Sequence, residues 1–254
     1  DCEKELIGGS VPATEHSVMS MGGQDDEIGT FKRLITEIYP KGIVSVVSDT
    51  WDFWRVLNEY LPALREIVLN RDGKLVIRPD SGDPVKIICG DRNASESHIQ
   101  RGAIQCLWDV FGGRVNAMGY QELDSHIGLI YGDSITPERQ IAILAGLKAK
   151  GFASSNVVLG IGSYTYQYVT RDTHGWAMKA TYGEVSGEGR PIFKKPVTDD
   201  GTKNSAKGLL SVWNDLETGL WCEEDVTWHK EGGGLLNTVF ENGDLKRFET
   251  LAEI

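Results

Sequence analysis

The sequence predicts an α/β fold: a (β/α) barrel that is incomplete in this chain, followed by an antiparallel β-rich region at the C-terminus. Short β-branched segments alternate with segments of helical period, which is typical of a parallel sheet covered by helices. Polar or acidic residues recur where the apolar segments end, and from about Lys179 onward glycine-rich turns separate short strands. We therefore expect a barrel portion in residues 1–178 and a β-rich region in residues 179–254.

Six apolar segments are expected to form parallel strands: Ser10–Ala13, Ile43–Asp49, Lys74–Asp80, Gly128–Asp133, Val157–Gly160 and Ala177–Tyr182. An open doubly wound sheet uses only the strand ends at its switch point, whereas a barrel gathers every strand end around one mouth. The repeated polar strand ends favour the barrel. Because a closed barrel usually has eight strands, we expect this chain to be part of a longer polypeptide or to work with another piece.

Helices and C-terminal strands complete the expected order. The amphipathic segments are Asp26–Ile38, Thr50–Tyr60, Ile99–Phe111 and Thr136–Lys150. In the last of these, Thr136 is expected to be the N-cap and Pro137 the first helical residue, with Gly151 just past the end. The expected antiparallel strands are Gly208–Trp213, Leu220–Glu223 and Leu236–Phe240.

Charge and composition limit the class of protein. The 254 residues carry a net charge of −11, which argues against broad binding to nucleic acid or to anionic membranes. Residues 171–207 carry seven basic and five acidic side chains, a local charge of +2 that suits a small anionic ligand or, equally, an ordinary solvated loop. No apolar run approaches the roughly 18 residues of a membrane span, and we expect a cytoplasmic protein. The cysteines lack paired spacing and are expected to be isolated thiols: Cys2, Cys89, Cys106 and Cys222.

Two carboxylates stand at expected strand ends. In IRPDSGDP, Arg78 and Asp80 alternate and Pro79 keeps the backbone extended, so both side chains can reach the mouth. An arginine suits phosphate and a carboxylate suits a sugar diol, although a structural Arg–Asp pair fits the pattern as well. Asp133 in YGDSITPE is a second such carboxylate, or an ordinary helix-entry residue. Fixed carboxylates would also stabilise positive charge on a ribose ring during cleavage at its anomeric carbon.

A histidine lies at the first strand end. His16 follows Glu15 in SVPATEHS, and an imidazole can be a nucleophile or proton carrier when a carboxylate fixes its tautomer. Asp49, in VVSDTWD at the neighbouring strand end, is the expected partner, although an isolated His–Asp contact is more often structural.

The segment VVLGIGSYTYQYVTRD suggests a phosphate loop. Gly160 and Gly162 would let the backbone approach a phosphate, and Ser163 would donate a hydrogen bond at the start of a helix. Phosphate sites recur at the late strand ends of barrels, but a GxG motif alone is a weak signal.

Five motifs, in this order, resemble the nicotinamide phosphoribosyltransferases: SVPATEHS, VSVVSDTWD, IRPDSGDP, YGDSIT and GIGSYTYQYVTRDTHGWAMKAT. The likeness extends from about Gly9 to LLNTVFENGDL near the C-terminus. The resemblance implies a type II phosphoribosyltransferase of NAD salvage that condenses nicotinamide with 5-phosphoribosyl 1-pyrophosphate in the presence of Mg²⁺. It also implies a homodimer with sites at the subunit interface.

The resemblance assigns roles to individual residues. It implies that ATP phosphorylates His16 with Asp49 as orienting partner, that Arg78 and Asp80 hold the phosphoribosyl substrate, and that Asp133 binds the ribose hydroxyls. Glu15 and Gly132 are expected to be substrate-binding residues as well. Further binding residues are implied at the phosphates, with the basic ones contributed across the dimer interface: Gly162, Ser163, Arg171, Lys179 and Lys194.

One departure from the family concerns its longer N-terminal part, which carries the residues that contact the pyridine ring. Discrimination between nicotinamide and nicotinate therefore cannot be argued from the residues of this chain, and we expect the isolated chain to be weakly active or inactive. Nicotinate phosphoribosyltransferase is the near alternative. A non-catalytic phosphate- or nucleotide-binding fragment is the alternative from another class.

Overall fold

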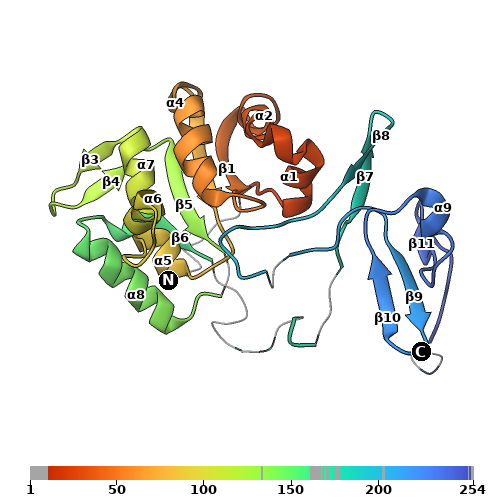
Figure 1. The fold of residues 1–254 in the computed structure, drawn as a ribbon. Helices are drawn as coiled ribbons and strands as arrows, with labels where there is room; N and C mark the ends of the chain where they lie inside the picture. The colour runs from red at the N-terminus through yellow and green to blue at the C-terminus, as the bar shows by residue number, and fades with distance from the viewer. Residues whose placement is uncertain are drawn as a thin grey trace. The chain divides into compact units, whose positions relative to one another are not determined.

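The computed structural model describes residues 11–132, 134–160, 167, 169, 172–174, 178–201, 204–250 and 252. The chain forms two compact units, which can be followed by colour in Figure 1. Unit 1 comprises Asp1–Lys179 and Lys194–Ser205, and unit 2 comprises Ala180–Phe193 and Ala206–Ile254. The chain therefore leaves unit 1, returns to it for a short segment, and leaves again.

Unit 1 is built around a four-stranded parallel sheet in the order β1-β2-β5-β6. The strands are β1 (Lys41–Val47), β2 (Asp72–Arg78), β5 (Ile127–Tyr131) and β6 (Val157–Leu159). The spatial order of these strands follows their order in the chain. The α/β class and the parallel sheet are thus confirmed. Strands β1 and β2 end two residues earlier than predicted, so Asp49 and Asp80 lie on the loops that follow them.

The first predicted strand is reduced, in its described residues, to one parallel bridge between Ala13 and Ser45. The Ser45 amide donates to the Pro12 carbonyl at 2.8 Å, and the Thr14 amide donates to the Ser45 carbonyl at 3.0 Å. Residues 12–14 therefore run beside β1 and bring the chain to the same end of the sheet as the other strand ends.

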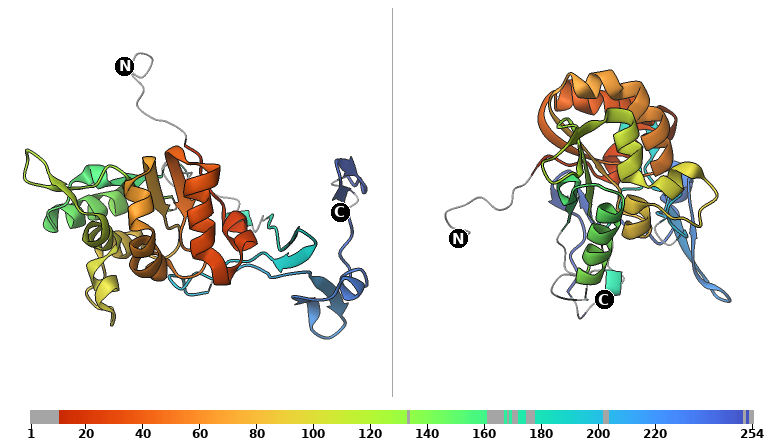
Figure 2. Two further views of the ribbon diagram at one scale, coloured as in Figure 1. Left: turned by 90° about the horizontal axis from the view of Figure 1, so that it is seen from above. Right: turned by 90° about the vertical axis from the view of Figure 1, so that its left-hand side faces the viewer.

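Helical segments connect the strands. The described helices of unit 1 are α1 (His16–Gly22), η1 (Gln24–Asp26), α2 (Glu27–Arg33), η2 (Leu34–Ile38), α3 (Phe53–Arg55), η3 (Val56–Tyr60), α4 (Leu61–Leu69), α5 (Pro84–Cys89), α6 (Ser97–Arg101), α7 (Ala103–Phe111), α8 (Pro137–Ala149), η4 (Ser154–Asn156) and η6 (Asp172–His174). Helix α4 contacts α7, and α5 contacts α7 and α8, so the crossover helices pack on one another (Figure 2). Their apolar faces and the strands form one core, in which Val44, Leu75 and Leu129 are almost fully buried.

Local signals set the helix boundaries. Thr136 caps α8 by accepting from the Arg139 amide at 3.3 Å, with Pro137 as the first helical residue, as predicted. The predicted helix over Ile99–Phe111 is instead broken at Gly102, whose φ of 79° lies outside the helical region. A short hairpin of β3 (Gly113–Val115) and β4 (Gln121–Leu123), which the sequence did not predict, follows α7.

Unit 2 contains three antiparallel hairpins and a short helix. The elements are β7 (Tyr182–Val185), β8 (Glu188–Pro191), β9 (Ser211–Asp215), β10 (Gly219–Glu223), α9 (Trp228–Glu231), β11 (Phe240–Glu241) and β12 (Asp244–Leu245). The predicted parallel strand over Ala177–Tyr182 is wrong for its described residues, because residues 178–181 form no strand and Tyr182 begins β7. Ser186 and Gly187 both have positive φ, which is the geometry of a tight hairpin loop, and this turn pairs Tyr182 with Pro191.

The cysteines that the structure describes are unpaired, as predicted. Burial raises the pKa of the Cys89 and Cys106 thiols to about 11, so both are inert at neutral pH, whereas Cys222 is exposed. Cys2 lies outside the described residues. Within the described ranges, the structure contains no helix of the length and apolar character that a membrane crossing requires.

Candidate active site

The register of β1 and β2 brings two aspartates together. Val47 is aligned with Arg78, and each aspartate follows two residues later, so Asp49 and Asp80 lie side by side at the carboxyl end of the sheet. The Asp80 amide donates to Asp49 Oδ2 at 2.9 Å, which joins the two loops directly. Because residues 12–14 run along the other side of β1, His16 at the start of α1 reaches the same place.

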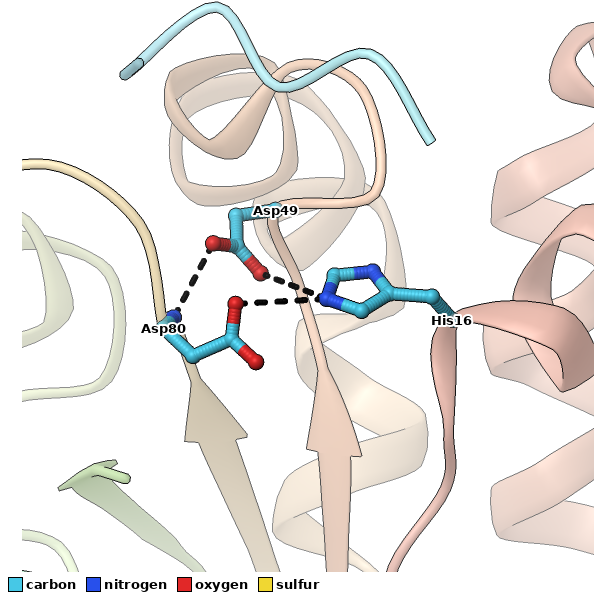
Figure 3. Close-up of side chains that lie close together, drawn as sticks. All are labelled: His16, Asp49 and Asp80. Atoms are coloured by element: carbon cyan, nitrogen blue, oxygen red, sulfur yellow. Dashed lines mark hydrogen bonds and ion pairs between the residues drawn. The ribbon is translucent and has the colours of Figure 1, made fainter. Parts of the chain in front are cut away.

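The His16 imidazole has polar partners on both of its nitrogens. Figure 3 shows the two carboxylates that face Nε2. Nε2 is 3.2 Å from Asp80 Oδ1 and 4.0 Å from Asp49 Oδ1, so Asp80 provides the hydrogen bond and Asp49 a longer ion-pair contact. Nδ1 is 3.1 Å from the Thr50 hydroxyl. The orientation of the ring is thus fixed from two sides, with Asp80 closer than the partner that the sequence suggested.

Asp49 is held in a dry environment. Its side chain is fully buried, and burial raises the pKa of the carboxyl above its ordinary value, with the nearby charge of Asp80 acting in the same direction. The hydrogen bond from Ser81, the proximity of His16 and the hydrogen bond from the Asp80 amide oppose this rise. Asp49 Oδ1 accepts no hydrogen bond within the described part of the chain. The carboxylate is therefore an electrostatic support for His16 that solvent does not reach.

Exposure separates the members of this cluster by role. The side chains of His16 and Asp80 are 17% and 22% exposed, whereas that of Asp49 is 0% exposed. A molecule bound at the strand ends can therefore touch His16 and Asp80 but not Asp49. An imidazole held by carboxylates is suited to nucleophilic attack or proton transfer, and an accessible carboxylate is suited to diol binding or to stabilising positive charge.

Arg78 lies next to this cluster at the end of β2. One of its terminal nitrogens donates to the Thr14 carbonyl, while Nε is buried and donates to no acceptor among the described residues. A Cβ placed on Gly132 would lie 3.8 Å from Arg78 Cδ, so the end of β5 approaches the guanidinium side chain. An incompletely satisfied guanidinium at the strand ends is suited to a phosphate.

Gly160 lies at the end of β6, where a side chain would not fit. A Cβ there would be 2.9 Å from Gly132 Cα and 3.2 Å from the Gly132 carbonyl oxygen. The glycine therefore allows the ends of β5 and β6 to approach each other, which is a packing reason in addition to the ligand reason suggested by the sequence.

The remaining predicted residues divide into those that the structure describes and those that lie outside the described residues. Glu15 and Lys179 are exposed, and the Glu15 carbonyl accepts a hydrogen bond from the Val18 amide. The Lys194 amide donates to the Ser205 hydroxyl at 2.9 Å. Predicted site residues that lie outside the described residues are Asp133, Gly162, Ser163 and Arg171. Residues that sequence reasoning missed are Thr50 and Ser81; both directly follow a predicted aspartate, and only the strand register shows that they point at the site.

His16, Asp49 and Asp80 are also the cluster of potential metal ligands found among the described residues, with ligand atoms within 4.8 Å of one another. The cluster does not suit a resident Mg²⁺ ion, because both carboxylates direct Oδ1 toward the imidazole. Mg²⁺ prefers near-octahedral oxygen ligands, many of them water.

Comparison with known proteins identifies relatives across nearly the whole chain. The chain is 57% identical over 256 residues to a nicotinamide phosphoribosyltransferase of Acinetobacter baylyi, which covers 98% of this chain and 50% of that protein. It is 44% identical over 217 residues to the Mycoplasma pneumoniae protein of the same name, covering 84% of this chain and 48% of that protein. It is 35% identical over 258 residues to the Xanthomonas campestris protein of the same name, covering 98% of this chain and 52% of that protein.

The chain thus spans about half the length of the curated relatives that it matches. The model of the nicotinate phosphoribosyltransferase (NAPRTase) family matches residues 4–244. This match includes the strands, His16 and both aspartates of the cluster, and the chain therefore belongs to the nicotinate phosphoribosyltransferase family.

Proposed function

We propose that this chain carries the phosphoribosyl-transfer site of a nicotinamide phosphoribosyltransferase of NAD salvage. The observation that carries the proposal is His16, whose Nε2 faces both Asp80 and Asp49 at the carboxyl ends of parallel strands in a member of this family. In the proposed reaction the pyridine nitrogen of nicotinamide attacks the anomeric carbon of 5-phosphoribosyl 1-pyrophosphate. The bond to pyrophosphate breaks, and pyrophosphate leaves with the electron pair.

The proposed roles follow from accessibility and charge. Asp80, partly exposed, would stabilise the positive charge that develops on the ribose ring, and Arg78, whose half-buried side chain lies at the strand ends, would bind a phosphate oxygen through a terminal nitrogen. Asp133 is proposed to hold ribose hydroxyls with Gly132, and Gly162 and Ser163 are proposed to bind phosphate. These roles match those that the resemblance implies.

His16 is proposed to accept a phosphoryl group from ATP, which would stimulate the reaction. Its imidazole is partly exposed and fixed on both nitrogens, so it is oriented before a phosphoryl donor arrives. Mg²⁺ is proposed to arrive with the pyrophosphate of the substrate, since the cluster itself does not suit that ion. His16→Ala should abolish stimulation by ATP and leave slow basal synthesis; full stimulation in this variant would exclude the phosphohistidine.

The four parallel strands are proposed to be part of a (β/α) barrel, carried by residues 1–178, with a β-rich region from residue 179 onward. The sequential order of the strands supports this proposal, and the greater length of the relatives leaves room for the remaining strands. We further propose a homodimer in which Arg171, Lys179 and Lys194 bring positive charge to the phosphates of the neighbouring subunit.

The test is an assay of the full-length protein with 5-phosphoribosyl 1-pyrophosphate and either nicotinamide or nicotinate. Formation of nicotinamide mononucleotide with release of pyrophosphate is expected. The names of the relatives favour the amide, and preferential use of nicotinate would identify the acid-specific alternative. Binding of the phosphoribosyl substrate without turnover of either base would instead favour a non-catalytic binding protein.

A further inference from the structure

Ser81 and Thr198 connect the site to the segment Lys194–Ser205 of unit 1, which we call the strap. Ser81 is fully buried, and its Oγ lies 2.5 Å from Asp49 Oδ2 and 2.5 Å from Thr198 Oγ1. The Ser81 hydroxyl thus joins the buried carboxylate behind His16 to Thr198, which lies 117 positions after Ser81 in the chain.

The chemistry of the groups fixes the direction of these bonds. Ser81 has one hydroxyl proton, which it donates to Asp49 Oδ2. The Ser81 oxygen can then only accept from its second neighbour, so Thr198 must donate. The result is an ordered chain from Thr198 through Ser81 to Asp49 Oδ2, the same oxygen that accepts from the Asp80 amide.

Backbone hydrogen bonds seat the strap on the loop that carries Asp49. The Lys195 amide donates to the Thr50 carbonyl at 2.9 Å, and the Val197 amide donates to the Trp51 carbonyl at 2.8 Å. Thr50 is also the residue whose hydroxyl contacts His16 Nδ1. The strap therefore contacts the loop that supports both the imidazole and the carboxylate.

The loop after β2 is shaped to receive the strap. A Cβ on Gly82 would lie 2.7 Å from the Thr198 carbonyl oxygen, so only glycine allows this approach. The Tyr131 hydroxyl shares its one proton between the Ser81 and Gly82 carbonyls, at 2.8 and 2.9 Å, in a bifurcated hydrogen bond. The turn is thus held from both sides, with the Ser81 hydroxyl between Asp49 and Thr198.

We propose that Ser81 and Thr198 are positioning residues that orient Asp49 behind His16 when the strap is seated. The expected effect of these two residues on turnover rests on the proposed function. Their expected effect on the orientation of Asp49 and on the strap is independent of it. Because Lys194 belongs to the same strap, an anion that binds Lys194 would also favour the orientation of the His16 cluster. The proposal gives the strap a role in arranging the reacting groups in addition to supplying positive charge.

The direct test compares Thr198→Val with Thr198→Ser in the full-length protein, with Thr36→Val at an exposed position of η2 as a control. Carbon-13 NMR of the aspartate carboxyls follows the titration of Asp49, and hydrogen exchange follows the Lys195 and Val197 amides. Thr198→Val should raise the titration midpoint of Asp49 by up to about one pH unit and accelerate exchange about tenfold. Thr198→Ser should restore both. The titratable groups of His16, Asp80 and Glu27 also interact with Asp49 and are present in each variant.

Ser81→Ala should produce a larger change in the same direction, since it removes the donor itself. If Ser81→Ala does not fold, the two Thr198 variants still decide the question. Wild-type values for both observables in Thr198→Val would overturn the proposal and leave the contact as simple packing.

The kinetic readout separates this proposal from the proposed function. Thr198→Val should lower kcat about tenfold with KM for the phosphoribosyl substrate changed less, and Thr198→Ser should recover the rate. If the wild-type protein has no transferase activity, the proposed function fails, and NMR and exchange still decide whether Thr198 positions Asp49. An active protein whose kcat is unaffected by Thr198→Val would overturn the positioning role.

Discussion

At the scale of single residues, the cluster divides into members that a substrate can touch and one that it cannot. His16 and Asp80 are partly exposed, and Asp49 is covered completely. A buried carboxylate can support the imidazole electrostatically without touching substrate or water. In a low-dielectric site such support is stronger than in solvent. Substitutions of Asp80 and Asp49 should therefore differ in their effect on substrate binding.

Asp80→Ala should lower kcat/KM by the equivalent of about 2 to 4 kcal/mol, because it removes a preorganised charge from the position where positive charge develops. Asp80→Asn retains the shape and should lose nearly as much. Steady-state kinetics of the full-length protein measures both. An unchanged rate in Asp80→Ala would remove this residue from the active site.

Glu27, outside the cluster, provides a prediction for stability against pH. The carboxyl is almost fully buried, and burial raises its pKa to about 8, with Asp52 adding to the rise and Arg55 opposing it. Between pH 4.5 and about 8 the unfolded chain loses this proton while the folded chain keeps it. The stability contributed by the neutral carboxyl is therefore complete below pH 4.5 and is lost as the pH rises toward 8.

Glu27→Gln should have little effect on stability near pH 4.5 and should stabilise the protein at pH 8 by up to about 4 kcal/mol. Urea unfolding at the two pH values measures the difference, with Glu37→Gln at an exposed position of η2 as the control. Equal effects of Glu27→Gln at both pH values would contradict a protonated carboxyl at this position.

The sequence predicted the residue types of the site better than their contacts. His16, Asp49 and Asp80 could be proposed because each follows an apolar strand. Thr50 and Ser81 could not, because small hydroxyl residues beside acidic ones are common in loops. Their roles depend on the alignment of Val47 with Arg78, which sets two loops side by side, and on the distant strap.

At the scale of elements, glycines decide where two helices end. Gly102 separates α6 from α7 with φ 79° and ψ 162°, and Gly112 ends α7 with φ 69° and ψ −148°. Both conformations are nearly restricted to glycine. A Cβ on Gly102 would lie 2.3 Å from the Gly90 backbone nitrogen, whereas a Cβ on Gly112 would meet nothing within 4 Å. The two positions share backbone strain and differ in available space.

Gly102→Ala should therefore destabilise the protein by at least about 2 kcal/mol more than Gly112→Ala, whose cost is the backbone strain of about 1 to 3 kcal/mol. Urea unfolding of both variants measures the difference. Similar losses in the two proteins would show that the backbone at Gly90 moves to accommodate the methyl group.

Helical period alone did not reveal the break at Gly102, because a glycine inside an amphipathic pattern is often tolerated. The decisive contact is with Gly90, which lies outside this helical segment of the sequence but is close to Gly102 in space. The strand prediction over Ala177–Tyr182 failed for a similar reason: an apolar segment does not specify its partner, and the turn at Ser186 and Gly187 pairs Tyr182 with Pro191 instead. The capped α8 was predictable because its signals are local.

At the scale of the whole molecule, unit 2 exposes more apolar surface than its hairpins can cover. Leu220 is 76% exposed, Phe240 64% and Phe248 78%. Two-stranded hairpins are at best marginally stable alone, and exposed apolar groups of this kind mark contacts with further protein. The proposed homodimer would cover such groups.

We expect the full-length protein to sediment as a dimer and Leu220→Arg to shift it toward the monomer. Val115→Arg, at an exposed position of unit 1, is the matched control and should leave the mass unchanged. Sedimentation velocity over a range of concentrations measures both. A dimer unaffected by Leu220→Arg would mean that this residue is covered by the same polypeptide or faces solvent.

The path of the chain between the two units also affects how such a protein can be recombined. Residues 194–205 pack with unit 1 but are encoded between two stretches that pack in unit 2. No single cut in the gene separates the units, so unit 2 cannot be exchanged between relatives as one contiguous cassette. A hybrid joined after Lys179 would pair Ser81 from one parent with Thr198 from the other, and its success would depend on how well these two hydroxyls match.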